Sequence, residues 1–498
     1  MFLKKHSTNY LLLTAFAAGM SIMAIEMAAS RLLAPYFGTS LFVWTNVLAI
    51  MMIALAIGYY AGGRIADQYA SERLLYKIIL ATGAYLSLVP LLSIPITRLS
   101  LKSIDHYAVG ATAFYFSLMV FLLVLPFVTL GMATPYILRL MAQRVDAVGH
   151  IAGKVFAWSN AGSIIGTFVP ALLTIPLMGT YKSIILFAGL LMILSIIGLS
   201  KWILWVIPAL SLLSISFLGK IKPTKGLIYD TESAYNYIQV VEEQGLRMLR
   251  LNEGHAEHSL YQKDKYLFDA VWDYYAFLPL LNHTKDALFI GLAAGTAARQ
   301  YAHFFPSIKI DGVEIDPAIV EVGKQYFDLK EDNLNIIIKD GRVHLATTQK
   351  TYDTILIDAY KQPYIPFHLT TKEFFTEVKN HLNERGVVGI NVGSTRHDSA
   401  ILLAIQHTMK SIFKHVYVVE AKSSLNYLVW ATNYELDVTD VETSHQVLNP
   451  LVNYIKRNYK EVLYDPTIPV FTDNVAPLEM YTEKMILDFA IDWKRSHR

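Results

Sequence analysis

Seven apolar runs fill the first 220 residues, and each is about long enough to cross a bilayer as a helix. Because lipid offers the backbone no hydrogen-bond partner, such runs fold as helices. The composition agrees, with 54% hydrophobic and 17% charged residues in 498. We expect residues 1–222 to form a multi-pass α-helical membrane domain with about seven spans. The runs lie at roughly 10–28, 42–62, 75–96, 111–138, 155–178, 183–199 and 202–218.

The first run follows Lys4 and Lys5, as a secretory signal would. Its length and the spans that follow favour a retained helix instead. We therefore expect an integral, multi-pass protein of the cell (inner) membrane, with the lipid bilayer as its first partner.

The composition changes abruptly at G-K-I-K-P-T-K-G, which begins at Gly219. Beyond it, Y-N-Y-I-Q-V-V-E and L-R-M-L-R-L-N alternate apolar and polar residues, as half-buried strands do. We expect a small β unit over residues 223–285.

Four later phrases each read as a strand that ends in polar residues: L-F-I-G-L-A-A-G-T, D-G-V-E-I-D-P, K-D-G-R and T-I-L-I-D-A-Y. Helices and strands alternate onward from these phrases, a pattern typical of a doubly wound α/β sheet. We expect residues 286–498 to form a Rossmann-like domain of the S-adenosylmethionine-dependent transferase type. In such sheets, ligands bind outside the carboxyl ends of the strands.

The same phrases supply the candidate ligand-binding residues. A turn with Gly291, Ala293 and Gly295 permits close approach of a ligand, and Glu314 follows about 20 residues later, where a carboxylate accepts from ribose hydroxyls. Asp340 and Gly341 offer a third contact. Because G-x-G-x-x-G is missing, an S-adenosyl compound fits this pattern better than a dinucleotide.

Several classes of function are disfavoured. A net charge of +2 without a basic stripe argues against nucleic-acid binding. The chain has no cysteine, which excludes disulfides and thiolate chemistry. His255, His258 and His283 lack the spacing of a helical metal site, so we expect no metal.

Residues 226 to about 435 resemble the spermidine synthase, or polyamine aminopropyltransferase, family, and the whole chain is similar to its membrane-fused branch. The glycine turn, E-I-D and K-D-G-R fall on the family's nucleoside-binding positions. V-W-D-Y-Y-A-F-L-P-L falls on the family's Y-H-E-x-x-x-x-x-P-L stretch, and the 18 residues from Asp358 to Phe375 align without gaps to the stretch that begins D-S-S-D. The late phrase F-T-D-N-V-A-P-L-E also resembles the membrane-fused branch.

The resemblance implies aminopropyl transfer from decarboxylated S-adenosylmethionine to an amine, with release of methylthioadenosine. An amine attacks only after losing its proton, and the alignment places Asp358 on the family's general base. It also places Asn236 on the position of a nucleoside-contacting glutamine. The residues that we expect at the acceptor are Tyr235, Asp273, Tyr360, Lys361 and His368.

Three departures from the family concern the amine. Ala294 stands where members carry an aspartate, and Lys361 replaces the second acid of D-S-S-D. Val271 and Trp272 occupy the tyrosine and histidine positions. Lys361 would repel a second ammonium but would suit an anionic or membrane-delivered acceptor. Without the loop aspartate, ordinary S-adenosylmethionine also fits as the donor.

Two other functions stay open. A methyltransferase would release S-adenosylhomocysteine, and a membrane transporter would use its soluble half only as a nucleoside or polyamine sensor. A homodimer is also consistent with the sequence.

The sequence gives conflicting signals for membrane sidedness. If the chain has seven spans and Lys4 lies on the cytoplasmic side, Arg64 and Arg139 also lie on that side, as the positive-inside rule prefers. The odd number of spans then places the soluble half outside the cell membrane. Lys220 and Lys222 argue the reverse, and an adenosyl donor is made in the cytoplasm. We expect a cytoplasmic transferase domain.

Overall fold

The computed structural model describes residues 8–37, 41–105, 109–142, 148–254, 256–361 and 363–496. The chain forms two compact units. A helical unit comprises Met1–Thr224 and Asp230–Tyr237, and an α/β unit comprises Lys225–Tyr229 and Ile238–Arg498. The helical unit thus includes residues 230–237, which the sequence analysis assigns to the β unit.

Among the described residues, six helices are long and apolar enough to cross a membrane. The expected seventh span corresponds to a shorter apolar helix, Trp202–Phe217, bounded by Lys201 and Lys220. The elements of the unit are α1 (Thr8–Phe37), α2 (Leu41–Gln68), α3 (Glu72–Asp105), α4 (Val109–Gly131), α5 (Ala133–Met141), α6 (Val148–Val169), η2 (Pro170–Thr174), α7 (Ile175–Met178), α8 (Thr180–Leu199), η3 (Trp202–Trp205), α9 (Val206–Ser214) and η4 (Ile215–Phe217).

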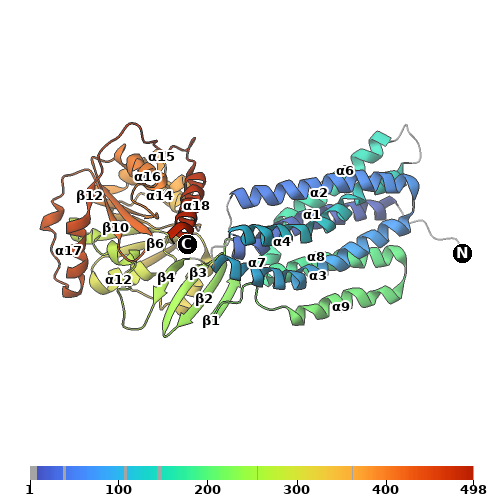
Figure 1. The fold of residues 1–498 in the computed structure, drawn as a ribbon, viewed down its shortest axis with the longest axis horizontal. Coiled ribbons are helices and arrows are strands. Elements are labelled where there is room, and N and C mark those ends of the chain that lie inside the picture. Colours follow the sequence, from blue (N-terminus) through green and yellow to red (C-terminus); the bar gives the residue numbers. More distant parts are fainter. Residues whose placement is uncertain are drawn as a thin grey trace. The chain divides into compact units, whose positions relative to one another are not determined.

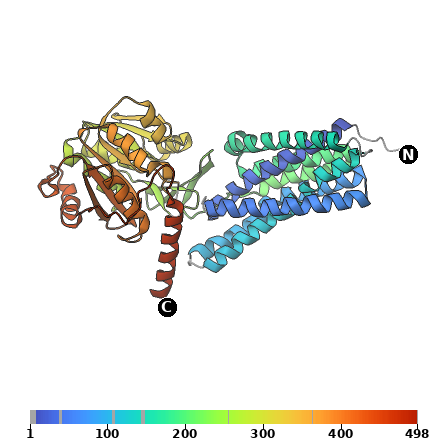
Figure 2. The same ribbon diagram turned by 90° about the horizontal axis from the view of Figure 1, so that it is seen from above.

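The long helices lie side by side, as Figure 2 shows for this unit. Small residues permit the closest approach. A Cβ atom at Gly162 or Gly166 would lie only 2.0 Å from a carbonyl oxygen of α1. Such contacts drive helix association in lipid, where burial of apolar side chains contributes little.

A break separates α6 from α8. The π-helical turn η2 begins at Pro170, and Pro176 lies within the short helix α7. A proline lacks the N–H that continues a helix, so the hydrogen-bond ladder is interrupted here. Gly179, with φ of 84°, then reverses the chain into α8.

Four antiparallel strands form a small sheet in the order β1-β2-β3-β4. The two predicted alternating segments are paired as β2 and β3, with Val240 opposite Leu249, which confirms that prediction. Gln244 and Gly245 both have positive φ and make the tight turn between them. The strands are β1 (Leu227–Glu232), β2 (Tyr237–Glu243), β3 (Leu246–Leu251) and β4 (Glu257–Tyr261).

The α/β unit has an eight-stranded sheet in the order β12-β10-β11-β9-β8-β5-β6-β7, with helices on both faces (Figure 1). Strands β5 to β9 run parallel. The predicted doubly wound sheet is confirmed. Its strands are β5 (Asp286–Ile290), β6 (Lys309–Glu314), β7 (Leu334–Ile338), β8 (Tyr352–Ile357), β9 (Leu382–Gly393), β10 (His415–Ala421), β11 (Asn426–Thr432) and β12 (Lys460–Glu461).

Successive residues of a strand point to opposite faces, so the sheet buries two cores. Along β8, Ile355 and Ile357 join one core and Leu356 joins the other. The helices that flank the sheet are α10 (Val271–Tyr275), α11 (Leu278–Asn282), α12 (Thr296–Phe304), α13 (Pro317–Tyr326), α14 (Gly341–Thr347), α15 (Lys372–Asn380), α16 (Ala400–Lys410), α17 (Asn449–Asn458) and α18 (Leu478–Ser496).

The strand order reverses between β5 and β8. From β5 the chain moves outward to β6 and β7, then returns to β8 on the other side of β5 and continues to β9. The crevice at such a reversal, outside the carboxyl ends of the strands, is where open α/β sheets bind ligands.

Candidate functional site

The reversal brings the first and the fourth phrase together. The Asp358 amide donates to the carbonyl oxygen of Ile290 at 2.8 Å, so the end of β8 lies beside the end of β5. At Gly291, φ is 92°, and a Cβ atom would lie 2.5 Å from the carbonyl oxygen of Asp358. This contact explains why glycine is required at that position.

Gly291→Ala is expected to destabilise the protein more than Gly245→Ala. Both glycines have positive φ, which costs an alanine about 1–2 kcal/mol. A Cβ atom at Gly245 meets nothing within 4 Å, whereas one at Gly291 meets backbone atoms of Asp358. Thermal unfolding of the two variants measures the difference. Equal losses would contradict the close approach of β5 and β8.

Glu314 ends β6 and holds the glycine turn. Its two carboxylate oxygens accept from the amides of Ala293, at 2.9 Å, and Asp316, at 3.1 Å. Burial raises the pKa of Glu314 to about 7, against the effect of these two donors. The carboxylate keeps lone pairs for ribose hydroxyls.

The rest of the turn leads into α12. Ala293 has a φ of 49°, and Gly295, with φ of 91°, precedes the helix. Ala294 is 2% exposed and packs with Ile238 and Val240 in an apolar cluster. The position at which the family carries an acid is therefore apolar in this chain.

Asp340 and His368 are in contact, although 28 residues separate them. Asp340 Oδ1 caps α14 by accepting from the amides of Arg342 and Val343, and Asp340 Oδ2 lies 3.2 Å from His368 Nε2. A Cβ atom at Gly341 would meet Ile290 at 2.3 Å, so α14 packs closely on β5.

Sequence analysis missed the ion-pair network beside this contact. The Arg342 guanidinium donates to both carboxylate oxygens of Asp473 at 2.8 Å and to Glu377 at 2.9 Å. Asp473 belongs to the late phrase F-T-D-N-V-A-P-L-E, which this pairing fixes to α14. The sequence feature that could have indicated this network is Arg342 within K-D-G-R.

Asp358 is held by side chains that the sequence analysis did not predict at the site. Trp272 Nε1 donates to Oδ2 at 3.1 Å, and Asn391 Nδ2 donates to Oδ1 at 2.8 Å. Asn426 Nδ2 in turn donates to Asn391 Oδ1 at 2.9 Å, which fixes the orientation of the Asn391 amide. Burial raises the pKa of Asp358 to about 6, and the bonds from Asn391 and Trp272 oppose that rise.

Asp273 is expected at the acceptor, but hydrogen bonds from the protein occupy both oxygens of its carboxylate. It accepts from the amides of Phe268 and Asp269 and from Gln300 Nε2 at 2.7 Å, and it is 5% exposed. Burial raises its pKa to about 6. These bonds point to a structural role, so the expected acceptor contact stays a prediction.

The remaining expected acceptor residues are arranged differently. The Tyr360 hydroxyl donates to the carbonyl of Asn391 at 3.0 Å and accepts from the amide of Gly393 at 2.7 Å, which fixes its ring beside Asp358. Lys361 is exposed and forms no ion pair with a residue that the structure describes. Tyr235 and Asn236 lie in the β1–β2 turn, within the helical unit, and their predicted roles remain predictions.

Within the described ranges, no group of three or more acidic or histidine side chains is placed to hold a metal ion. His255 lies outside those ranges.

A family model described as the spermine/spermidine synthase domain matches residues 272–439. A "probable polyamine aminopropyl transferase" of Bifidobacterium longum is 36% identical over 189 residues, which cover 38% of this chain and 42% of that protein. The polyamine aminopropyltransferase of Vibrio vulnificus is 28% identical over 278 residues, 51% of this chain and 91% of that protein.

Among solved structures, a probable spermidine synthase from Corynebacterium glutamicum aligns with 52% of this chain and 99% of its own, at 16% identity and a TM-score of 0.41. The chain spans less than half of the Bifidobacterium relative. The residues that the spermine/spermidine synthase model matches include Trp272, Glu314, Asp340 and Asp358.

Proposed function

We propose that the chain transfers an aminopropyl group from decarboxylated S-adenosylmethionine to an amine and releases methylthioadenosine. Asp358 acts as the general base. The observation that carries this proposal is its carboxylate at the strand reversal, oriented by Trp272 and Asn391, with a pKa of about 6. Such a carboxylate is ionised at neutral pH and accepts the proton that the amine must lose.

In this mechanism the protein aligns the reactants and removes one proton. The amine nitrogen attacks the carbon beside the sulfonium, and the carbon–sulfur bond breaks, leaving its electron pair on sulfur. Glu314 would hold the ribose, and Asp340 would contact the adenine. Positioning of this kind makes the displacement effectively unimolecular.

The direct test is turnover by the full-length chain with both donors and a panel of amines. Methylthioadenosine formed only with decarboxylated S-adenosylmethionine supports the proposal. S-adenosylhomocysteine formed from the ordinary donor would instead establish a methyltransferase. Tight nucleoside binding without either product would overturn both, in favour of a sensor.

The methyltransferase is kept as the second candidate because of Ala294. Its apolar, buried environment offers no carboxylate for the free ammonium of a decarboxylated donor. An aspartate in place of Ala294 would pair with the free ammonium of the decarboxylated donor. Its absence is therefore expected to weaken binding of that donor alone. A donor preference measured by calorimetry therefore separates the two reactions.

We also propose that the acceptor carries only one cationic group near the site. Lys361 follows Asp358 by three residues and has no described counter-ion, so it would repel a second ammonium and attract an anion. A monoamine or an amine with a negative group should therefore compete better than a diamine.

For membrane sidedness, we propose a cytoplasmic transferase unit, because the donor is made there. Leu218 and Thr180 line one cavity, so the helix Trp202–Phe217 returns to the end at which α8 begins. Arg64 and Arg139 lie at the other end of the helices. The positive-inside rule, taken alone, would make that end cytoplasmic and so argues against this assignment. A fluorescent reporter fused to the carboxyl terminus should fold and fluoresce in the cytoplasm. An active alkaline phosphatase fusion at the same terminus would place it outside and reverse the assignment.

A further inference from the structure

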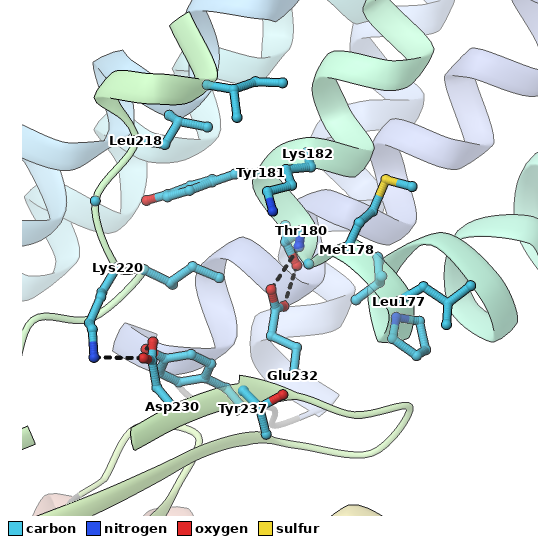
Figure 3. A pocket seen from close by; sticks show the side chains of 17 residues that line it. Leu177, Met178, Thr180, Tyr181, Lys182, Leu218, Lys220, Asp230, Glu232 and Tyr237 are labelled. Carbon is cyan, nitrogen blue, oxygen red and sulfur yellow. Dashed lines mark hydrogen bonds and ion pairs between the residues drawn. The ribbon is translucent and has the colours of Figure 1, made fainter. Parts of the chain in front are cut away.

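The helical unit contains a cavity of about 370 Å³ at the end where α8 begins. All its lining residues belong to that unit. Figure 3 shows polar side chains from β1 and α8 facing apolar side chains from α7 and the segment after η4. A cavity that is polar on one side and apolar on the other is suited to an amphiphile.

The polar wall contains two acids and two lysines, but only one acid and one lysine pair with each other. Lys220 Nζ lies 2.9 Å from Asp230 Oδ1, and the Tyr237 hydroxyl donates to Asp230 Oδ2 at 2.9 Å (Figure 3). Neither Glu232 nor Lys182 forms an ion pair with any residue in the described ranges. The cavity therefore presents one carboxylate and one ammonium without direct counter-ions.

Glu232 is fixed in place by α8. Its oxygens accept from the Thr180 amide at 2.7 Å and from the Thr180 hydroxyl at 2.5 Å. Burial raises the pKa of this carboxyl, and the bonds from Thr180 and the charge of Arg31 only partly oppose that rise. Each oxygen retains a lone pair, so the carboxylate can accept from an ammonium ligand, which would stabilise its ionised form.

The apolar wall continues into the surface of the helices. Leu177, which lines the cavity, is 74% exposed, and Leu172 and Leu173 of η2 are also exposed. This wall exists because Pro170, Pro176 and Gly179 interrupt the helix. An acyl chain can therefore lie on this wall while its headgroup enters the cavity.

We infer that this cavity binds the headgroup of an aminophospholipid, with the ammonium on Glu232 and the phosphate on Lys182. The Lys182 ammonium would repel a polyamine, and the Glu232 carboxylate would repel a purely anionic headgroup. A headgroup with both charges is therefore the best match. A primary amine is also what the proposed reaction consumes. That link rests on the proposed function, whereas the binding itself does not.

The test uses the full-length chain in detergent, incubated with equal amounts of phosphatidylethanolamine, phosphatidylcholine and phosphatidylglycerol with identical acyl chains. Retained lipids are quantified by mass spectrometry, without donor or turnover. We expect a roughly tenfold preference for phosphatidylethanolamine, the effect of one charge-assisted hydrogen bond. Choline lacks the N–H donors, and glycerol lacks the positive charge.

Lys182→Gln should lower the retention of all three lipids, because each carries the phosphate, and Lys201→Gln, at the far end of α8, should leave retention unchanged. Lys182 is exposed, so its replacement does not threaten folding. Glu232→Gln should specifically abolish discrimination between ethanolamine and glycerol headgroups. Equal retention of the three lipids by the wild-type chain, or undiminished retention by Lys182→Gln, would overturn the proposal. Full displacement by soluble phosphoethanolamine would overturn the lipid as the source of the headgroup.

Discussion

Asp358→Asn is expected to lower kcat by roughly 10²–10⁴-fold, the usual contribution of a general base. Asparagine keeps the shape of the side chain, but its one oxygen can accept from only one of Trp272 and Asn391, and it cannot accept a proton. Because Asp358 is not expected to touch the nucleoside, the dissociation constant for methylthioadenosine should change little. Steady-state kinetics and calorimetry on the same preparation separate these two effects.

Asp353→Asn provides the matched control. Asp353 lies near the start of the same strand, where its carboxylate accepts from the amides of Lys285 and Asp286. Its replacement should lower the unfolding temperature without removing the chemical step. If Asp358→Asn retained near wild-type kcat, Asp358 would not be the base. A comparable kcat loss in Asp353→Asn would show that the effect is structural.

The pH dependence identifies the base independently. With a pKa of about 6, Asp358 is ionised above that pH, and kcat/KM should fall tenfold per pH unit below it. Trp272→Phe keeps the ring but removes the N–H that stabilises the carboxylate. The pKa should therefore rise, and the acid limb of the profile should move to higher pH. An unmoved limb would show that another group titrates.

The sequence predicted features that depend on short stretches of chain. Apolar runs, alternating strands and a glycine turn are local patterns, so the helical unit, the small sheet and the doubly wound sheet were all expected. Gly291 could be recognised because a turn after a buried strand needs its conformation. The α7 break shows the limit of this approach, since Pro170 and Pro176 lie in an apolar run that otherwise resembles one straight span.

The parts that were missed depend on contacts between distant residues. Trp272 and Asp358 are 86 residues apart, and Arg342 and Asp473 are 131 apart. No periodic pattern encodes such pairs. Asp273 falls on the acid of the family's Y-H-E stretch, and its expected contact with the acceptor stays a prediction. Neighbouring residues of a helix point in different directions. The Asp273 carboxylate accordingly bonds with Gln300, away from the donors to Asp358.

Glu314→Gln is expected to weaken methylthioadenosine binding by about 10–100-fold. A carboxylate accepts both ribose hydroxyls, and hydrogen bonds to a charged group contribute about 1.5–3 kcal/mol. Glutamine presents one acceptor oxygen and must also replace the bonds from Ala293 and Asp316. Calorimetric titration of the full-length chain in detergent measures the loss. Glu321→Gln, in an exposed pair with Lys324 on α13, is the matched control.

The pH dependence of this affinity separates a direct contact from a distorted turn. With a pKa of about 7, Glu314 loses its negative charge as the pH falls from about 8 to about 6, so wild-type affinity should decline across that window. Glu314→Gln cannot titrate there, and its weaker affinity should stay flat. If the variant kept the wild-type pH dependence, another group would govern binding. If Glu314 only supported the glycine turn, the wild-type affinity would follow the thermal stability of the unit rather than the ionisation of this carboxyl.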